Sequence, residues 1–309
     1  MATSFAYSHP HSLDADDVLA GLRGPRKRLP SRLLRTELFE RICRLDAYYP
    51  ARLEQALLAD HVANIAHQVG RHARVIEPGS GEGVKTRTLL HALDRPSAYV
   101  PVDTAHEQLQ RTAAALRTEL PGVEISPVTH DYTQPFDLPV PQHAVATTLV
   151  FMPGSTIGGF EPGEARALLA QLGQIAGPDR LLLLGADATR DVSAIERAYE
   201  DEMFTKHVLA RLNATRGATF DLHGFEHRAT WNPTRARIEL SLVSTARQVV
   251  QIDDEVIAFA SGESIEIAHS YKHTPAAMQA ILVGAGWRLR QVFTARERPV
   301  RLWLCEPLR

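Results

Sequence analysis

The sequence predicts an α/β protein in which helices connect the strands of a parallel sheet, with a second region built on an antiparallel sheet. Strand and helix patterns alternate from Arg74 to Gly185, which is typical of right-handed crossovers in a parallel sheet. From Phe225 to Ser270, short segments of alternating polar and apolar residues are typical of antiparallel strands. The chain has 309 residues, about twice the usual size of one domain, so two domains are expected.

Composition places the chain among ordinary globular proteins. Hydrophobic residues make up 44% and charged residues 23% of the sequence, which argues against disorder and against a coiled coil. The 34 basic and 36 acidic side chains leave a formal net charge of -2, so no global attraction to nucleic acid is expected. A small-molecule partner fits this composition better than a nucleic acid or a membrane.

The cysteines, the histidines and the N-terminus exclude further classes. Cys43 and Cys305 lie far apart without a Cys-x-x-Cys partner, so neither a disulfide framework nor a structural zinc site is expected. The 14 histidines show no His-Glu-x-x-His or comparable spacing, so no metal is expected. The N-terminus lacks the pattern of a signal peptide, and no apolar run approaches the ~18 residues of a membrane span. We therefore expect a cytoplasmic protein, a monomer or a weak homodimer.

The first 33 residues show little periodicity and are expected to form an arm. A basic stretch from Arg23 to Arg35 is interrupted by glycine and proline. Such a run is more often a solvated surface than a binding site, because the rest of the chain does not extend the positive charge. Helical patterns follow over Leu33–Leu45 and Pro50–Val69.

The remaining elements follow the two sequence patterns, first alternating strands and helices and then antiparallel strands. Strands are expected at Arg74–Glu77, Ala98–Val102, Val123–Val128, Ala144–Phe151 and Leu181–Gly185, and helices at Val84–Leu93, His106–Leu120 and Pro162–Ile175. Helices at Asp191–Tyr199 and Thr205–Thr215 lead to antiparallel strands, of which the clearest are Arg237–Val243 and Ser264–Ser270. A helix at Pro275–Ala285 and strands at Arg288–Phe293 and Arg301–Cys305 are expected to return to the first sheet.

The segment that most clearly indicates ligand binding is Val75–Gly83, which reads Val-Ile-Glu-Pro-Gly-Ser-Gly-Glu-Gly. It places an acidic residue and three alternating glycines between a strand and a helix. Glycines let the backbone approach a ligand closely, and the helix N-terminus offers unpaired N–H groups. Asp103 ends the next strand, 20 residues after Gly83, where a carboxylate can bind both hydroxyls of a ribose. Together these features predict a nucleotide-type ligand.

The details favour S-adenosylmethionine over NAD. The dinucleotide fingerprint has its third small residue one position later than Gly83, where this chain has Val84. Glu77 is a poor neighbour for a pyrophosphate and a suitable one for a positively charged sulfonium. Asp131 and Tyr132 follow the third strand, where they can bind the adenine amino group and cover the base.

Three further motifs carry a family resemblance. They are Arg-Leu-Asp-Ala-Tyr-Tyr-Pro-Ala-Arg over 44–52, Lys85-Thr86 after the glycines, and Gly-Ser-Thr-Ile-Gly over 154–158. In them the chain resembles the histidine N-methyltransferases of ergothioneine biosynthesis. That family also includes the methyltransferase part of ovothiol synthase and a fungal enzyme that methylates dimethylallyltryptophan. The resemblance extends from about Leu33 to Cys305.

This resemblance implies a Rossmann-like, S-adenosylmethionine-dependent methyltransferase domain and a second domain that recognises the substrate. The methyltransferase domain would contain residues 71–190 and 273–309. After an arm of residues 1–33, the substrate domain would combine helices in 34–70 with the inserted helices and sheet of 191–272. The implied substrate is histidine or a close derivative.

The cofactor residues of the family carry over by position. The matches are the glycine turn, the lysine after it, the ribose carboxylate and the adenine site: Gly79, Ser80, Gly81, Lys85, Asp103, Asp131 and Tyr132. Glu77 joins this set as the residue before the turn.

The substrate residues carry over in part. Tyr49, next to Tyr48, matches the tyrosine of the family's Tyr-Tyr-Pro turn. Tyr199 matches a tyrosine that holds the substrate carboxylate, and Ser270 matches a serine that meets the imidazole. Methyl transfer depends on positioning and on exclusion of water, so Tyr49 is the candidate catalytic residue that orients the acceptor.

At two positions the chain departs from the family. Gly159 replaces an asparagine that grips the amino acid head, and Ala268 replaces a glutamate that pairs with the imidazole. Because side chains alternate along a strand, Glu266, Ala268 and Ser270 are expected on one face, where Glu266 could partly replace the glutamate.

These departures predict that a ring nitrogen of histidine, rather than the α-nitrogen, accepts a single methyl group. An imidazole with a pKa of about 6.5 presents a free lone pair at neutral pH, whereas an α-ammonium must first lose a proton. Methylation of the α-nitrogen, of histidine or another amino acid, is the alternative.

One other function class remains open, and another is disfavoured by the sequence. A catalytically silent S-adenosylmethionine-binding protein would account for both departures. A nucleic-acid amino-methyltransferase would need an Asp/Asn-Pro-Pro-aromatic turn after the fourth strand, which Phe151-Met152-Pro153-Gly154 does not provide.

Overall fold

The computed structural model describes residues 15–30, 33 and 41–308, which form two compact units. The antiparallel unit contains the described residues up to Tyr48 together with 190–271. The parallel-sheet unit contains 49–189 and the chain from Lys272 onward. The chain therefore passes from one unit to the other between Tyr48 and Tyr49, after Thr189 and after Tyr271.

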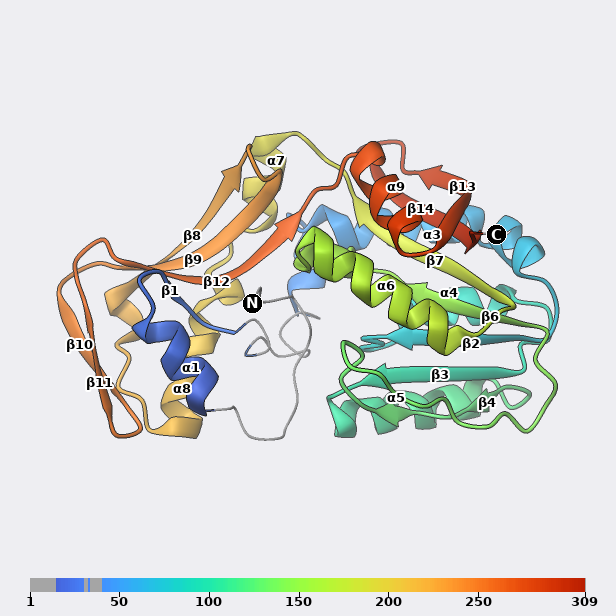
Figure 1. Ribbon diagram of the computed structural model, residues 1–309, viewed down its shortest axis with the longest axis horizontal. Coiled ribbons are helices and arrows are strands. Elements are labelled where there is room, and N and C mark those ends of the chain that lie inside the picture. The colour runs from blue at the N-terminus through green and yellow to red at the C-terminus, as the bar shows by residue number, and fades with distance from the viewer. Residues whose placement is uncertain (1–14, 31–32, 34–40, 309) are drawn as a thin grey trace. The chain divides into compact units, whose positions relative to one another are not determined.

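The parallel-sheet unit contains an eight-stranded sheet (Figure 1). Its strands are β2 (Ala73–Pro78), β3 (Ala98–Asp103), β4 (Glu124–Ile125), β5 (Val128–Thr129), β6 (Thr147–Met152), β7 (Arg180–Asp187), β13 (Trp287–Thr294) and β14 (Val300–Pro307). The order is β13-β14-β7-β6-β2-β3-β4, and β5 also pairs with β3. The strands from β2 to β7 are parallel, while β14 lies antiparallel between β7 and β13. The predicted return of the last two strands to this sheet is confirmed.

Helices precede or connect these strands. They are α3 (Tyr49–Val69), α4 (Val84–Ala92), α5 (His106–Glu119), α6 (Pro162–Ala176) and α9 (Pro275–Gly284). Three of them, α3, α6 and α9, have a proline in the first turn, where its missing N–H is not needed. The cap of α6 is a capping box between Glu161 and Glu164, and the Thr274 hydroxyl caps α9 at the Ala277 N–H. These local signals explain why the helices begin where the sequence predicts.

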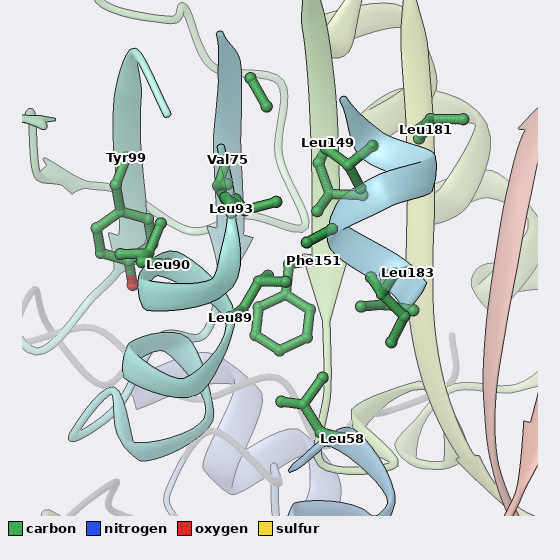
Figure 2. Close-up of a cluster of buried hydrophobic side chains, with 14 of the residues drawn as sticks. Leu58, Val75, Leu89, Leu90, Leu93, Tyr99, Leu149, Phe151, Leu181 and Leu183 are labelled. Atoms are coloured by element: carbon green, nitrogen blue, oxygen red, sulfur yellow. The ribbon is translucent and has the colours of Figure 1, made fainter. Parts of the chain in front are cut away.

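The core of this unit lies between the sheet and the helices α3 and α4. Figure 2 shows Leu58 of α3 and Leu89 of α4 pointing toward Phe151 of β6, with Leu183 of β7 beside them. All four side chains are at most 1% exposed. Burying a leucine or phenylalanine of this kind stabilises the fold by about 1.5–3 kcal/mol.

This packing corrects the predicted place of α3. We expected residues 34–70 to belong to the substrate domain, but α3 lies in the parallel-sheet unit. The apolar stripe that includes Leu57, Leu58, Ile65 and Val69 packs against the sheet and α4. A helical pattern shows which face is buried without showing what covers it.

The antiparallel unit contains a four-stranded sheet with the order β1-β12-β9-β8 (Figure 1). Its strands are β1 (Lys27–Arg28), β8 (Phe225–Asn232), β9 (Arg237–Ser244) and β12 (Ser264–Tyr271). A separate hairpin contains β10 (Gln248–Ile252) and β11 (Glu255–Phe259). The helices are α1 (Ala15–Arg23), α7 (Val192–Ala198) and α8 (Lys206–Arg216), with 3-10 turns at Glu202–Phe204 and Leu222–Gly224.

The predicted arm is wrong for its described part, because residues 15–30 form a helix and a strand of this unit. Val18, Leu22 and Leu29 are at most 1% exposed. The β1 strand pairs with β12, and Lys27 forms an ion pair with Glu263 at 2.8 Å. Two buried residues four positions apart are too few to produce a visible periodicity. Most of the helix predicted over residues 33–45 lies outside the described residues. Within its described part, residues 41–43 are helical.

Candidate functional site

The predicted cofactor residues lie at the carboxyl edge of the parallel sheet. Glu77 is the second-last residue of β2, Asp103 ends β3, and Asp131 follows β5. The chain continues from β2 to β3 on one side and reaches β6 on the other side of β2. Open α/β sheets bind ligands at such a switch point, outside the carboxyl ends of the strands.

The glycine turn after β2 has the conformation that its sequence predicts. Gly79, Gly81 and Gly83 have φ angles of +70°, +52° and +70°. The N–H of Gly79 donates to the Val102 carbonyl at 2.7 Å, which fastens the turn to β3. A Cβ at Gly79 would lie 3.4 Å from the Tyr132 ring, so the ring lies directly over this turn. Residues other than glycine rarely adopt these φ values, so the conformation of this turn explains the glycines at all three positions.

Two buried polar atoms at this turn, Asp103 Oδ2 and Ser80 Oγ, make no hydrogen bond of ordinary geometry among the described residues. The N–H groups of Gly81 and Thr104 still lie close enough to the Asp103 carboxylate to act against the rise of its pKa. The other carboxylate oxygen, Asp103 Oδ1, accepts the Ala105 N–H at 2.9 Å. Asp103 is 3% exposed, and this burial raises its pKa. A buried acceptor without a partner is costly, and hydroxyl groups of a ligand would satisfy it.

Glu77 points into the protein. Its Oε2 accepts hydrogen bonds from Thr86 Oγ1 at 2.5 Å and from Tyr99 OH at 2.6 Å. Burial raises its pKa to about 7, although both hydrogen bonds act in the opposite direction. The residue therefore connects β2, β3 and α4 beneath the glycine turn.

The segment after β5 forms a tight turn. Asp131 Oδ1 accepts both the N–H of Thr133 at 2.9 Å and its hydroxyl at 2.6 Å. Tyr132 is 1% exposed, and its carbonyl accepts Gln171 Nε2 at 3.2 Å. The structure thus brings the Tyr132 ring to the glycine turn, and the carboxylate of the preceding residue, Asp131, is fixed by Thr133.

Lys85 pairs with a residue that the sequence analysis missed. Its ammonium lies 2.8 Å from Glu54 Oε1, which also accepts the Gly154 N–H at 2.6 Å. Glu54 is 1% exposed, and a Cβ at Gly185 would clash with its carboxylate. The sequence could have indicated Glu54, because it is an acidic residue next to Leu53 in the apolar stripe of the predicted helix. Glu54 links α3 to α4 and to the loop after β6.

A second missed cluster surrounds Tyr49. The Tyr49 hydroxyl donates to Asp187 Oδ2 at 2.6 Å, and the Lys272 ammonium lies 3.1 Å from the same oxygen. Thr189 donates its N–H and its hydroxyl to Asp187 Oδ1 at 2.9 and 2.6 Å. Tyr49, Asp187 and Lys272 are 4%, 1% and 0% exposed. Asp187 ends β7, so it stands at the carboxyl edge of the sheet as Asp103 does.

The Gly-Ser-Thr-Ile-Gly loop is attached to this cluster. Ser155 has a φ of +55°, and its Oγ accepts the Asp187 N–H at 3.0 Å. Gly159 ends the 3-10 turn Thr156–Gly159 and is buried. It is not one of the glycines with positive φ, so the backbone there does not require glycine.

In the antiparallel unit, two of the predicted substrate residues lie together. The rings of Tyr48 and Tyr199 meet edge to face, with centroids 5.5 Å apart. Phe204 packs against both rings at 5.9 and 5.1 Å. His227 Nε2 lies 2.9 Å from the Tyr199 carbonyl, and burial lowers the pKa of His227. Neither Phe204 nor His227 stands in a sequence motif that would have predicted its place beside Tyr199.

The predicted face of Glu266 is wrong, because β12 contains a β-bulge. Glu266 pairs with Ser241, and Ala268 pairs with the next residue of β9, Leu240, so Ile267 is an extra residue. A bulge reverses the alternation of side chains beyond it. Glu266 accordingly shares a face with His269, Tyr271 and Arg237, and lies 3.7 Å from the Arg237 guanidinium.

Ala268 and Ser270 lie together on the opposite face of the strand. They stand directly across from Leu240 and Ile238, both fully buried. Glu266 therefore cannot replace the glutamate that is missing at Ala268. Of the described side chains in these two pairs, only that of Ser270 is polar.

The predicted site residues are distributed over both units. The parallel-sheet unit holds all the cofactor residues together with Tyr49 and Gly159. The antiparallel unit holds Tyr48, Tyr199 and Ser270. Among the residues described here, no helix is both long and apolar enough to cross a membrane.

Comparison with known proteins gives matches over most of the chain. Residues 14–307 match the family model described as "Histidine-specific methyltransferase, SAM-dependent". A histidine N-alpha-methyltransferase of Mycobacterium tuberculosis is 36% identical over 284 residues, which cover 87% of each chain. One of Mycolicibacterium smegmatis is 35% identical over 286 residues, which cover 88% of each chain. The N-methyltransferase imqF of Aspergillus flavus is 28% identical and covers 91% of this chain and 81% of its own length.

A solved structure shows the same fold. The crystal structure of an S-adenosylmethionine-dependent methyltransferase from Clostridium acetobutylicum matches with a TM-score of 0.53. The match covers 88% of this chain and 98% of that chain at 9% sequence identity. At this identity the likeness concerns the fold alone.

Proposed function

Because this chain belongs to the family of histidine-specific, S-adenosylmethionine-dependent methyltransferases, we propose that it methylates the α-nitrogen of L-histidine or a closely related amino acid. Membership in the family makes the chain an S-adenosylmethionine-dependent methyltransferase, which confirms the predicted cofactor and enzyme class. The family also acts on a small-molecule amino acid, as expected. The acceptor atom and the residues that contact each ligand belong to the proposal.

The observation that carries the cofactor part is the pair of unsatisfied buried atoms at the glycine turn. Asp103 Oδ2 would accept hydrogen bonds from the ribose hydroxyls, and Ser80 Oγ would bind another polar group of the cofactor. Tyr132, whose ring lies over Gly79, and Asp131 would flank the adenine. The residues present therefore fit S-adenosylmethionine.

The other predicted cofactor residues have supporting roles in this proposal. Glu77 holds the glycine turn from beneath through Thr86 and Tyr99. Lys85 is held by Glu54 close to the loop after β6. When bound, S-adenosylmethionine supplies a methyl group on a positively charged sulfur. The protein has to position a nitrogen lone pair in line with that group and keep water out.

Two observations support the α-nitrogen as the acceptor. Both mycobacterial relatives are named for methylation of that atom, and each matches this chain over almost its full length. Tyr49, the predicted catalytic residue, has a buried and specifically held hydroxyl at the carboxyl edge of the sheet. A tyrosine in this state can orient an amino group, which has several N–H donors.

A ring nitrogen is the second candidate. It is favoured by Gly159 and Ala268, since neither residue offers the side-chain hydrogen bond that the family has there. With Glu266 on the other face of β12, Ser270 is the polar residue left to meet an imidazole. The two candidates differ in the mass of the fragments that carry the methyl group.

Product analysis tests the proposed function. The protein is incubated with isotope-labelled S-adenosylmethionine and a panel of amino acids that includes L-histidine, and the product is fragmented in a mass spectrometer. We expect the label on the α-nitrogen, and markedly less product with Asp103→Ala at the same subsaturating cofactor concentration. Label on the imidazole ring would favour the second candidate, and no methylated amino acid from wild-type protein would refute the proposed function.

A further inference from the structure

The hydroxyl of Tyr49 has its hydrogen committed to one partner. Tyr49 Oη lies 2.6 Å from Asp187 Oδ2, which is the only acidic side chain in this cluster of described residues. Lys272 Nζ lies 3.1 Å from the same oxygen, and an ammonium can only donate. The backbone N–H and the hydroxyl of Thr189 occupy Oδ1. Asp187 is therefore surrounded by donors at both oxygens.

The charges of the cluster agree with this pattern. Burial alone would raise the pKa of Asp187, but the Lys272 ammonium and the hydrogen bonds from Thr189 and Tyr49 hold it below its ordinary value. Burial raises the pKa of the Tyr49 hydroxyl well above its ordinary value, and the charge of Asp187 adds to this effect although Lys272 opposes it. Asp187 is thus a carboxylate, and Tyr49 keeps its proton.

A tyrosine hydroxyl has a single hydrogen, so a hydroxyl that donates to Asp187 can bind any further partner only as an acceptor. We infer that Asp187 and Lys272 are positioning residues that hold the Tyr49 hydroxyl as a hydrogen-bond acceptor for an N–H group of the methyl-accepting substrate. This inference rests on the proposed function for the identity of that substrate. It assigns a role to two buried, charged residues that the cofactor site does not use.

The direction of this hydrogen bond matters for the chemistry. An amine has one lone pair, and a hydroxyl that donated to the amine would occupy the electrons that must attack the methyl group. A hydroxyl that accepts an N–H leaves that lone pair free and restricts its direction. The nitrogen lone pair then forms the new N–C bond while the carbon–sulfur bond breaks, and the released electron pair stays on sulfur. The N–H proton remains on the nitrogen throughout this step.

Replacing Asp187 by asparagine should reverse the hydrogen bond. The Thr189 backbone N–H can only donate, so the amide oxygen of the variant has to take the position of Oδ1. The amide nitrogen then faces Tyr49 Oη and donates to it, which turns the tyrosine hydrogen toward the substrate. The single change would remove the anion that Lys272 pairs with and would destabilise the fold. The double variant Asp187→Asn with Lys272→Met avoids this loss, because it removes both charges of the buried pair.

Kinetics of a small set of variants test this inference. The set is wild type, Tyr49→Phe, the Asp187→Asn/Lys272→Met variant, and all three substitutions combined. We expect Tyr49→Phe and the double variant each to lower kcat for the acceptor at least about tenfold, with the S-adenosylhomocysteine Kd unchanged within about twofold. The combined variant should be no slower than the slower of the two, because both act through one hydroxyl. Wild-type kinetics in the folded double variant, additive losses, or a parallel loss of S-adenosylhomocysteine affinity would overturn the inference.

A second measurement separates this inference from the proposed function. If wild-type protein methylates no amino acid, the proposed function fails, but the direction of the hydrogen bond can still be measured. The carbon that bears the hydroxyl of tyrosine has an NMR shift that depends on whether the hydroxyl donates or accepts. With 13Cζ-labelled tyrosine, and Tyr49→Phe to assign the signal, the Tyr49 resonance should move between wild type and the double variant. An unmoved resonance contradicts the inference whatever the substrate is.

Discussion

Replacing Asp103 by asparagine should weaken cofactor binding without weakening the fold. In the structure one oxygen of Asp103 is used by the Ala105 N–H, and the other is buried without a described partner. Asparagine keeps an acceptor for Ala105 and removes the buried charge. The variant therefore separates what Asp103 does for a ligand from what it does for the local structure.

The expected magnitude follows from the two kinds of hydrogen bond. Bonds from hydroxyl groups to a carboxylate contribute about 1.5–3 kcal/mol, so their loss corresponds to a roughly 10- to 100-fold weaker Kd for S-adenosylhomocysteine. Asp103→Ala should lie at the upper end, and Asp103→Asn, which keeps some hydrogen bonding, at the lower end.

The stability of the ligand-free protein should change in the other direction. Burial raises the pKa of Asp103 above its ordinary value of 3.8, so above that pH the unfolded chain ionises this group more readily than the folded one. Asp103 therefore costs the ligand-free protein stability as the pH rises through this window. At neutral pH Asp103→Asn should have an equal or higher Tm than wild type, as is common when a functional group is removed from its site.

Calorimetric titration with S-adenosylhomocysteine and thermal unfolding measure the two effects. A matched control is Asp94→Asn, since Asp94 is exposed and pairs with Arg71 at the surface. It removes the same charge and should change neither quantity. Wild-type affinity in folded Asp103→Asn and Asp103→Ala would show that Asp103 does not bind the ribose.

Three further outcomes are expected from other parts of the structure. Because burial raises the pKa of Glu77 from 4.5 to about 7, wild-type protein should lose roughly 3 kcal/mol of stability as the pH rises through this range, and urea unfolding should show that Glu77→Gln removes this loss. Gly185→Ala places a methyl group against the Glu54 carboxylate and should destabilise the protein by about 1–3 kcal/mol in the same measurement; an unchanged midpoint would contradict the packing described. Gly159→Asn combined with Ala268→Glu should raise kcat/KM for L-histidine relative to other aromatic amino acids at least about tenfold; an unchanged ratio would mean that these positions do not select the substrate.

The parts of the fold that could be predicted are those that local patterns determine. The strands of the parallel sheet are buried on both faces, so they are visible as short apolar runs between turns. Their carboxyl ends then place Glu77, Asp103 and Asp131 at one edge without further information. The three glycines were equally visible, because their positive φ values exclude most other residues.

The features that could not be predicted depend on distant contacts or on irregular strands. The apolar stripe of α3 is clear in the sequence, but nothing local shows that it packs on the parallel sheet. Asp187 and Lys272 come from distant parts of the chain, and neither stands in a motif. The bulge at Ile267 involves neither glycine nor proline, so strict alternation placed Glu266 on the wrong face.

The Tyr49 cluster and the bulged strand β12 belong to different units of the chain. Tyr49 and Lys272 both contact the Asp187 carboxylate, and Ser155 accepts the Asp187 backbone N–H, so these residues form one bonded cluster within the parallel-sheet unit. On β12, Ala268 and Ser270 pair with a buried leucine and a buried isoleucine, so Ser270 is the polar side chain among these described residues. Under the proposed function, a site with fewer polar groups at these positions should reject other amino acid side chains less strongly, since fewer buried polar groups remain unpaired with the wrong ligand. In that proposal Gly159 and Ala268 bear on which amino acid is accepted, whereas the Tyr49 cluster bears on how its nitrogen is presented to the methyl group.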